Sequence, residues 1–250
     1  MKISISIISH LQKHFISNLI ECINKYAKYK NYEILLTINM HEENKIAISD
    51  SLPLRITYNT MPKGFGANHN AAFRHATGDF FCVLNPDIRL VSDPFPALVD
   101  LASQDGVGVV APEIFDGAGH REDSARYFPT PFEVLGKVFG GRSATVPDLP
   151  HGSAPDWVAG MFMLFPRKVF EEVGGFDERY FLYYEDVDIC ARLALAGYKR
   201  LVCADAQAIH DAQRSSHHSL RYTAMHMHSM WRFFTSDVYR KIRQHRKLAS

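Results

Sequence analysis

The first third of the chain alternates between short β-branched runs and longer amphipathic stretches. Three runs predict strands: ISISII (residues 3–8), EILLTI (33–38) and LRITY (54–58). A helical pattern extends from about Phe15 to Tyr29, and a loop, PKGFGANHN, precedes a second predicted helix at 67–76. The run DFFCVL (79–84) is continuously apolar, as in a strand buried on both faces. This order predicts an α/β fold with a mostly parallel central sheet flanked by helices.

Polar residues follow the predicted strands, at the edge where open α/β sheets bind ligands. They are Ser9 and His10 after the first strand, Asn39 after the second, and Asn85-Pro86-Asp87 after the fourth. Because Pro86 fixes the turn, the carboxylate of Asp87 is suited to a hard cation that bridges phosphate oxygens. The alternative is that Asn85 and Asp87 serve only to shape the turn. The loop GFGANHN lacks the third glycine of GxGxxG, so it fits a tightly packed helix entry at least as well as a dinucleotide site.

A second group of candidate residues lies in YFLYYEDVDIC (180–190), where three acids follow an aromatic run. The sequence VDICARLALAG predicts a helix that begins at these acids, with Glu185 and Asp188 on one face and Asp186 directed elsewhere. We expect Asp188 to be structural, interacting with the helix dipole and with Arg192. For an isolated Glu-Asp pair, an ordinary acidic helix start is the simpler interpretation.

Composition removes several classes of function. With 250 residues, of which 46% are hydrophobic, the chain reads as one globular domain. A formal net charge of +1 argues against a generally basic nucleic-acid binder, and the four cysteines form no CxxC pair. No signal-peptide core precedes the first strand, and the longest apolar runs are too short to span a bilayer. We therefore expect a cytoplasmic protein that at most lies on a membrane surface.

The segment after Ser216 predicts one long helix or two. Apolar residues recur near helical spacing: Leu220, Met227, Met230, Trp231, Phe234 and Val238. Basic residues crowd its end: Arg240, Lys241, Arg243, Arg246 and Lys247. Three interpretations remain open, namely an amphipathic helix on an anionic membrane, a homodimer helix, or a helix packed on the domain.

Several stretches occur in a familiar order: ISIISH, KGFGANHNAAFRHATGDFFCVLNPDI, DWVAGMFMLFPRKVFEEVGGFDERYFLYYEDVDICARLALAGY and AIHDAQRSS. In these stretches the chain resembles the inverting glycosyltransferases of family 2, particularly bacterial rhamnosyltransferase-like members, over roughly residues 3–235. The resemblance implies an A-type, Rossmann-like glycosyltransferase fold over 1–216. Residues 1–112 would bind the nucleotide sugar, residues 113–216 the acceptor, and 217–250 would form a basic amphipathic helical tail.

The resemblance also assigns residues to the donor site. The NPD turn matches the family's Asp-x-Asp, with Asn85 in place of the first acid and Asp87 as the one that meets Mn²⁺ or Mg²⁺. His210 matches a histidine that helps hold the metal or diphosphate, although a histidine ending an apolar strand is often only hydrogen-bonded in place. Asn39 stands where many members carry an Asp for the base or ribose. The expected nucleotide-sugar-binding residues are Ser9, His10, Asn39, Lys63, Gly66, Asn70, Asn85, Asp87 and Arg126.

The family's Glu-Asp pair maps onto Glu185 and Asp186. An inverting transfer needs one base to take the proton of the acceptor hydroxyl. By resemblance Asp186 is that base and Glu185 orients the acceptor. The aromatic residues before them would raise the pKa of the base by desolvation and offer flat faces to a sugar. Trp157 is a candidate for stacking on the acceptor, with core packing as the alternative.

These expectations combine into one function. We expect a metal-dependent, inverting glycosyltransferase that moves a sugar, best dTDP-L-rhamnose as donor, to a glycan or lipid-linked glycan in bacterial surface polysaccharide or lipopolysaccharide O-antigen synthesis. It would work in the cytoplasm or at the cytoplasmic face of the inner membrane. Because Asn39 and Asn85 replace family acids, the alternative is an inactive nucleotide-sugar-binding or scaffold protein of the same fold. A nucleic-acid module on the basic tail is a third alternative, and we expect no nucleic-acid partner.

Overall fold

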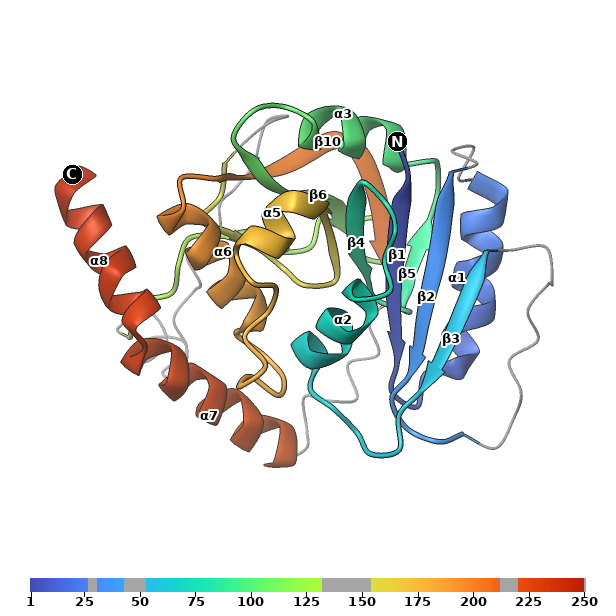
Figure 1. Ribbon diagram of the computed structural model, residues 1–250, viewed down its shortest axis with the longest axis horizontal. Coiled ribbons are helices and arrows are strands. Elements are labelled where there is room, and N and C mark those ends of the chain that lie inside the picture. The colour runs from blue at the N-terminus through green and yellow to red at the C-terminus, as the bar shows by residue number, and fades with distance from the viewer. Residues whose placement is uncertain (27–30, 43–52, 132–153, 212–219, 250) are drawn as a thin grey trace.

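The computed structural model describes residues 1–26, 31–42, 53–131, 154–211 and 220–249, and within them the fold is built on one eight-stranded sheet (Figure 1). The strands of this sheet are β1 (Ile3–Ser9), β2 (Tyr32–Ile38), β3 (Leu54–Tyr58), β4 (Phe80–Leu84), β5 (Ile88–Leu90), β6 (Val107–Phe115), β9 (Phe162–Pro166) and β10 (Lys199–His210). A small second sheet pairs β7 (Ala125–Arg126) with β8 (Trp157–Val158). The helices are α1 (Lys13–Tyr26), α2 (Phe65–Phe73), α3 (Phe95–Ala102), α5 (Arg167–Glu172), α6 (Glu185–Leu195), α7 (Leu220–Thr235) and α8 (Asp237–Ala249).

Strand direction brings the predicted polar residues to one edge of the sheet. The strand order is β3-β2-β1-β4-β9-β6-β10-β5, and the first four strands are parallel. β9 is antiparallel to both of its neighbours, so β6 and the parallel strand β10 again run in the direction of β1. The carboxyl ends of β1, β2, β4 and β10 therefore lie at the same edge.

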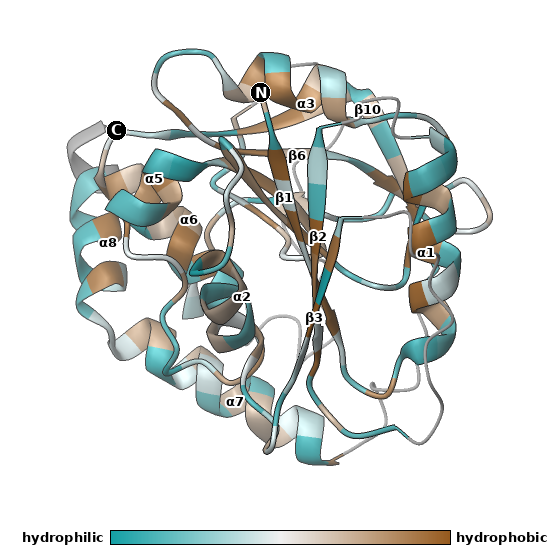
Figure 2. Ribbon diagram, turned by 45° about the vertical axis from the view of Figure 1, so that its right-hand side comes forward, coloured by the Kyte–Doolittle hydropathy of each residue, from teal (hydrophilic) through white to brown (hydrophobic). Residues whose placement is uncertain are grey.

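Hydrophobic side chains pack on both faces of the sheet. Along β1, Ile3, Ile5 and Ile7 share one buried cluster with the apolar side of α1 and with α3. The alternating residues Ser4 and Ser6 face the other way, where α2 lies. On that second face a separate buried cluster joins α2, α5 and α6 (Figure 2). The result is a layer of helices on each side of a sheet whose central strands are buried.

The carboxyl-terminal helices pack on the second face. Phe233 of α7 and Tyr239 and Ile242 of α8 are buried in the same cluster as α6, and α8 lies against α6. This arrangement matches the packed-helix interpretation of the tail. The side chains of Arg246 and Lys247, which the sequence assigned to its basic end, lie outside the described part of the chain.

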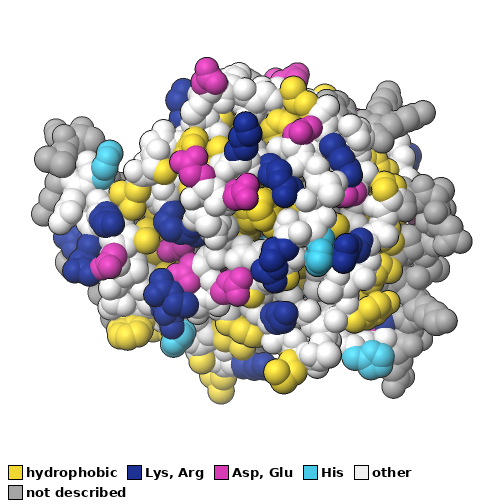
Figure 3. Space-filling model, viewed as in Figure 1, with side chains coloured by type: hydrophobic (Ala, Val, Ile, Leu, Met, Phe, Trp, Pro, Cys, Tyr) yellow, Lys and Arg dark blue, Asp and Glu magenta, His cyan; other side chains and the backbone are white. Residues whose placement is uncertain are grey.

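The predicted elements agree with the structure to within a few residues. The strands at 3–8, 33–38, 54–58 and 79–84 are confirmed. The helix predicted for 67–76 begins earlier, at Phe65, and ends at Phe73, after which His75 N and Ala76 N donate to the carbonyls three residues back, as in a turn. The last predicted turn of α1, residues 132–153 and the boundary at 216–217 lie outside the described residues. Acidic and basic side chains are interspersed over the face shown in Figure 3, consistent with the near-neutral composition.

Candidate active site

The turn after β4 positions Asp87 against the end of β10. Ile88 N donates to Asn85 O at 3.2 Å, so the turn predicted from the sequence is present, and Asn85 N donates to Met161 O at 2.9 Å. Asp87 Oδ2 lies 3.3 Å from His210 Nε2. Asp87 Oδ1 is buried and makes no hydrogen bond to the described residues. The turn therefore does more than reverse the chain, because it aims a carboxylate at the histidine that the resemblance paired with it.

The other nitrogen of His210 contacts a carboxylate that the sequence did not indicate. Its Nδ1 lies 2.8 Å from Glu122 Oε2. Burial disfavours the charged imidazolium, but Asp87 and Glu122 outweigh that effect and raise the pKa of His210 to about 9. Without a bound cation the imidazole therefore favours its protonated form, which donates to both acids, and a cation bound at Nε2 would displace the proton held there.

The residues present fit a divalent cation. Asp87 offers an oxygen without a hydrogen-bond partner among the described residues, and His210 offers an imidazole nitrogen beside it, a ligand set that suits Mn²⁺. No group of three or more His, Cys, Asp or Glu side chains among the described residues is arranged around a common metal position. Phosphate oxygens of a donor and water would therefore have to complete the coordination, as is usual for Mg²⁺ at phosphate sites.

The acidic helix α6 follows two residues in an unusual backbone conformation. Tyr183 and Tyr184 have φ values of 69° and 67°, in the left-handed region that bulky residues rarely adopt. Such residues cost about 1 kcal/mol or more each, so the surrounding structure must hold them. Ser229 of α7 donates to Leu182 O at 2.7 Å, and the His226 ring packs edge-on against Tyr183. Helix α7 thus helps to hold the turn that presents the acids.

Asp186 is held by backbone amides. Its Oδ2 accepts from Gly160 N at 3.0 Å and its Oδ1 from Val187 N at 2.8 Å, and the side chain is half-buried. Burial raises the pKa of Asp186, while the two N–H groups and the charge of Arg126 offset part of that rise. The direction agrees with the desolvation expected of a base in this position.

The two neighbouring acids have different surroundings. Glu185 is 5% exposed, and its Oε2 has no partner among the described residues. Burial and the charge of Asp186 raise the pKa of Glu185 well above its ordinary value. Asp188 is buried on the same side and pairs with Arg192 Nε at 2.7 Å, as the sequence predicted. Asp186 therefore differs from both in being partly open.

The dipeptide Gly160-Met161 connects Asp186 with the turn after β4. Gly160 N contacts the carboxylate of Asp186, and Met161 O accepts from Asn85 N. Because these are adjacent residues, Asp186 and the Asn85–Asp87 turn lie on either side of one short segment. The segment therefore links the carboxylate of Asp186 to the turn that carries Asp87.

Arg126 and Trp157 face each other in the β7–β8 pair. The Arg126 guanidinium lies 5.3 Å from the centre of the Trp157 ring, and its Nε lies 2.8 Å from Asp123 Oδ2. Trp157 is 8% exposed, and its Nε1 donates to Tyr127 O at 3.0 Å. An acceptor sugar needs an uncovered ring face, so the structure favours core packing for Trp157 over acceptor stacking. Arg126 places a positive charge near Asp186.

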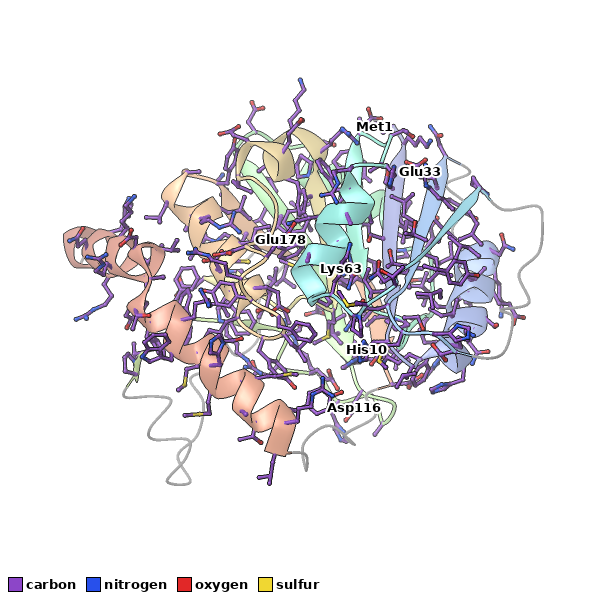
Figure 4. The ribbon with its side chains drawn as sticks, turned by 60° about the horizontal axis from the view of Figure 1, so that its bottom comes forward. Met1, His10, Glu33, Lys63, Asp116 and Glu178 are labelled. Carbon is purple, nitrogen blue, oxygen red and sulfur yellow. The ribbon has the colours of Figure 1, made fainter. Side chains whose placement is uncertain are left out.

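On the donor side, Asn39 joins two loops. The side chain is buried, and its Nδ2 donates to Lys63 O at 2.9 Å while its Oδ1 accepts from Lys63 N at 2.8 Å. Nδ2 also lies 3.0 Å from His10 Nδ1. Burial and then Arg221 lower the pKa of His10, which favours the neutral ring. Figure 4 shows His10 and Lys63 toward the same end of the molecule, away from Met1 and Glu33.

Residues 4–174 match the family model described as Glycosyl transferase family 2. The chain belongs to this family. It is 30% identical over 233 residues to "Rhamnosyltransferase WbbL" of Escherichia coli (strain K12), which covers 85% of this chain and 84% of WbbL. It is 34% identical over 149 residues to "N-acetylglucosaminyl-diphospho-decaprenol L-rhamnosyltransferase" of Mycobacterium tuberculosis (strain ATCC 25618 / H37Rv), covering 55% of this chain and 48% of that protein. This glycosyltransferase is thus rhamnosyltransferase-like, as the sequence motifs indicated.

Solved structures confirm the A-type fold of the glycosyltransferase. The chain aligns with GalNAc-T7, crystallised with UDP, GalNAc and Mn²⁺, at a TM-score of 0.66 and 16% identity, over 85% of this chain and 44% of that one. It aligns with the mannosyltransferase PcManGT from Pyrobaculum calidifontis, in complex with GDP-Man and Mn²⁺, at a TM-score of 0.61 and 16% identity, over 90% of this chain and 61% of that one. At this identity the likeness concerns the fold.

Three residues expected to bind the donor have packing or support roles in the glycosyltransferase. A Cβ on Gly66 would lie 2.6 Å from Phe176 Cβ, so the missing side chain lets α2 approach the segment before the acids. Asn70 Nδ2 donates to Phe176 O at 2.8 Å, and Asn70 Oδ1 accepts from Phe176 N at 2.9 Å. Ser9 is fully buried and donates to Glu42 Oε1 at 3.2 Å. The tight-packing alternative for the glycine loop is the one that the structure supports.

Sequence reasoning missed Glu122 and the left-handed tyrosines of the glycosyltransferase. Glu122 stands in a loop sequence, HREDSAR, where nothing local separates it from a solvated acid. The sequence analysis expected the tyrosines to desolvate the base and contact a sugar, and bulky aromatic side chains are not a signal for positive φ. Each feature depends on a partner far along the chain.

Proposed function

We propose that this chain is an inverting glycosyltransferase that transfers L-rhamnose from dTDP-L-rhamnose to a glycan or lipid-linked glycan. The observation that carries the proposal is that one short segment, Gly160-Met161, contacts both Asp186 and the turn that holds Asp87 against His210. The names of the relatives support the choice of sugar, since two of them are rhamnosyltransferases. The expected product belongs to a bacterial surface polysaccharide or lipopolysaccharide O-antigen, and one further relative is "O-antigen biosynthesis protein RfbC" of Myxococcus xanthus.

Asp186 takes the proton in this reaction. As the acceptor oxygen forms its bond to the anomeric carbon, its proton passes to the carboxylate of Asp186. The bond between the anomeric carbon and the diphosphate oxygen breaks, and its electron pair leaves with the nucleoside diphosphate. The N–H groups of Gly160 and Val187 hold the carboxylate in orientation. Burial makes that carboxylate more basic than a solvated one.

The donor's diphosphate occupies the space next to Asp87 and His210 in this proposal. A divalent cation, Mn²⁺ or Mg²⁺, would neutralise charge on the leaving diphosphate when bound. Asp87 and His210 Nε2 would hold the cation. The backbone hydrogen bonds of Asn85 fix the turn that carries Asp87. Lys63 and Arg126 add positive charge on the donor side. Asn39 would act through Lys63 and His10, whose positions it fixes.

An inactive nucleotide-sugar-binding protein remains the competing proposal. It draws on Asn85 and Asn39, which replace family acids. The chain nevertheless keeps the acid and histidine of the metal pair and a desolvated carboxylate in the base position. These retained groups support an enzyme, because binding alone does not require a base facing the acceptor.

Helices α7 and α8 expose apolar and basic side chains that suit contact with the membrane in which a lipid-linked acceptor lies. No helix among the described residues is both long and apolar enough to cross a bilayer. On α7, Leu220, Met227 and Trp231 are 89%, 52% and 64% exposed. On α8, the exposed residues Arg240, Lys241 and Arg243 supply positive charge. We propose peripheral contact with anionic lipid at the cytoplasmic face of the inner membrane, with a homodimer as the competing use of the same surface.

Donor binding and turnover test the proposed function together. We expect dTDP-L-rhamnose to raise the thermal unfolding midpoint in Mn²⁺ and much less in EDTA, since a ligand of the folded state stabilises it by mass action. UDP-GlcNAc and GDP-mannose serve as control donors and should raise the unfolding midpoint less than dTDP-L-rhamnose does. Mass spectrometry of an N-acetylglucosaminyl-diphospho-lipid acceptor should show an added deoxyhexose. Binding without any added sugar would favour the inactive alternative, and no shift with any nucleotide sugar would contradict both.

A further inference from the structure

Two successive side-chain contacts at the edge of the sheet join Glu122 to His210 and His210 to Asp87. Glu122 Oε2 lies 2.8 Å from His210 Nδ1, and His210 Nε2 lies 3.3 Å from Asp87 Oδ2. The residues come from three distant parts of the sequence, and His210 is 88 positions from Glu122. Neither the sequence motifs nor the resemblance assigned Glu122 a role.

The backbone fixes both ends of the Glu122–His210 contact. Glu122 N donates to Ile114 O at 2.8 Å, and Glu122 O accepts from Ser124 N at 2.9 Å. His210 ends β10 and pairs with Ile88 of β5, next to the turn that carries Asp87. Because the backbone on both sides of this contact is already ordered, holding the two side chains together costs little further conformational entropy. The contact is therefore set by the fold rather than by a flexible surface loop.

The chemistry of the contact decides which imidazole nitrogen is free. A carboxylate that accepts from Nδ1–H fixes the tautomer and the ring orientation, which leaves the Nε2 lone pair for a metal ion. Nε2 is the nitrogen that faces Asp87, whose Oδ1 has no partner among the described residues. We infer that Glu122 is a positioning residue: it holds His210 so that Nε2 and Asp87 together bind the divalent cation of the donor complex. This inference rests on the proposed function.

Metal affinity tests the inference without relying on turnover. Mn²⁺ binding would be titrated by calorimetry in the presence of dTDP, for the wild-type chain, Glu122→Gln and Glu122→Ala. We expect Glu122→Ala to weaken Mn²⁺ binding by about 10- to 100-fold, as is typical for removal of such a partner. Glu122→Gln should lie between the two, because its amide oxygen still accepts from Nδ1–H but carries no charge.

A matched control separates this effect from general loss of acid charge. Glu113 of β6 pairs instead with Arg121, at 2.9 Å. Glu113→Gln should therefore leave Mn²⁺ affinity unchanged. A ¹⁵N spectrum of the His210 ring gives a second reading on folded protein: Nδ1 should carry the proton in the Mg²⁺-dTDP complex of the wild type, and the two tautomers should mix in Glu122→Gln.

Two results would overturn the inference. Wild-type Mn²⁺ affinity in Glu122→Ala, with affinity lost in His210→Ala, would leave the metal pair in place and remove Glu122 from it. Unchanged affinity in both variants would show that neither Glu122 nor His210 contributes to metal binding. Sugar transfer that still depends on Asp186 would in that case leave the proposed function standing. If Glu122→Ala does not fold, equal ring spectra for Glu122→Gln and the wild type would overturn the inference by themselves.

Discussion

At the scale of single residues, two adjacent acids differ because of what surrounds them. Glu185 is enclosed, and its Oε2 has no partner among the described residues. Asp186 receives two backbone hydrogen bonds and remains half-buried. A group stabilised by oriented N–H donors can stay ionised where an unpartnered neighbour is pushed toward its neutral form. This difference supports the proposed division of roles, with Asp186 as the base and Glu185 as its neighbour.

The enclosed acid makes a prediction for stability. Burial and the charge of Asp186 raise the pKa of Glu185, so the folded state holds its proton more tightly than the unfolded state does. The stability that Glu185 contributes is therefore full at low pH and falls as pH rises from about 4.5 through the raised value. Glu185→Gln should raise the free energy of unfolding on the order of 1 kcal/mol at pH 7.5 and change it little at pH 4.

Urea unfolding at the two pH values would check this expectation. Glu21→Gln, on the exposed side of α1, is the control and should give no gain at either pH. A Glu185→Gln variant that is less stable than wild type at pH 7.5 would mean that the charge is stabilised where we describe it as unfavourable.

At the scale of elements, the carboxyl-terminal helices belong to the domain. Tyr239 and Ile242 of α8 are each 5% exposed and pack in the cluster that includes α6, the helix that carries the acids. The apolar spacing in the sequence predicted helices here but left their partner open. The structure identifies that partner, because side chains that are spaced for one helical face become buried against α6.

Removal of α8 should therefore destabilise the protein. A chain ending after Val238 loses Tyr239 and Ile242 from the core, and we expect a loss of about 3–5 kcal/mol in the free energy of unfolding, as for large-to-small core changes. The triple variant R240Q/K241Q/R243Q keeps the buried residues and should unfold like wild type, while binding anionic liposomes less in low salt. An unchanged unfolding midpoint in the truncated chain would contradict the packing of α8.

Local patterns predicted the elements, whereas contacts between distant segments were beyond them. The β-branched runs and the helix at Glu185 could be read from spacing, since period and propensity act over a few residues. The antiparallel course of β9 could not, because an apolar run such as FMLFP carries no direction. Glu122 was also missed, because its partner His210 is 88 positions away in the sequence and only the folded sheet brings the two together. Resemblance supplied the roles of Asp87, His210 and Asp186.

At the scale of the whole molecule, one antiparallel strand assembles the candidate site. The parallel strands β1, β2, β4 and β10 bring their carboxyl ends to one edge of the sheet. β9 runs the other way, and its first residue, Phe162, pairs with Leu84 at the end of β4. The preceding residues Gly160 and Met161 therefore arrive at that edge and contact Asp186 and Asn85. This reversal is why one segment contacts both Asp186 and the turn after β4.

The rate of sugar transfer by Asp186→Asn tests the central claim most directly. With saturating dTDP-L-rhamnose and Mn²⁺, a single-turnover assay on the lipid-linked acceptor should show transfer lowered by about two to four orders of magnitude, the usual contribution of a general base. The thermal shift produced by donor and Mn²⁺ should stay at the wild-type value, and Asp105→Asn, at an exposed acid, should transfer normally. Wild-type transfer by Asp186→Asn would contradict its role as the base, and with it the account of how this site works.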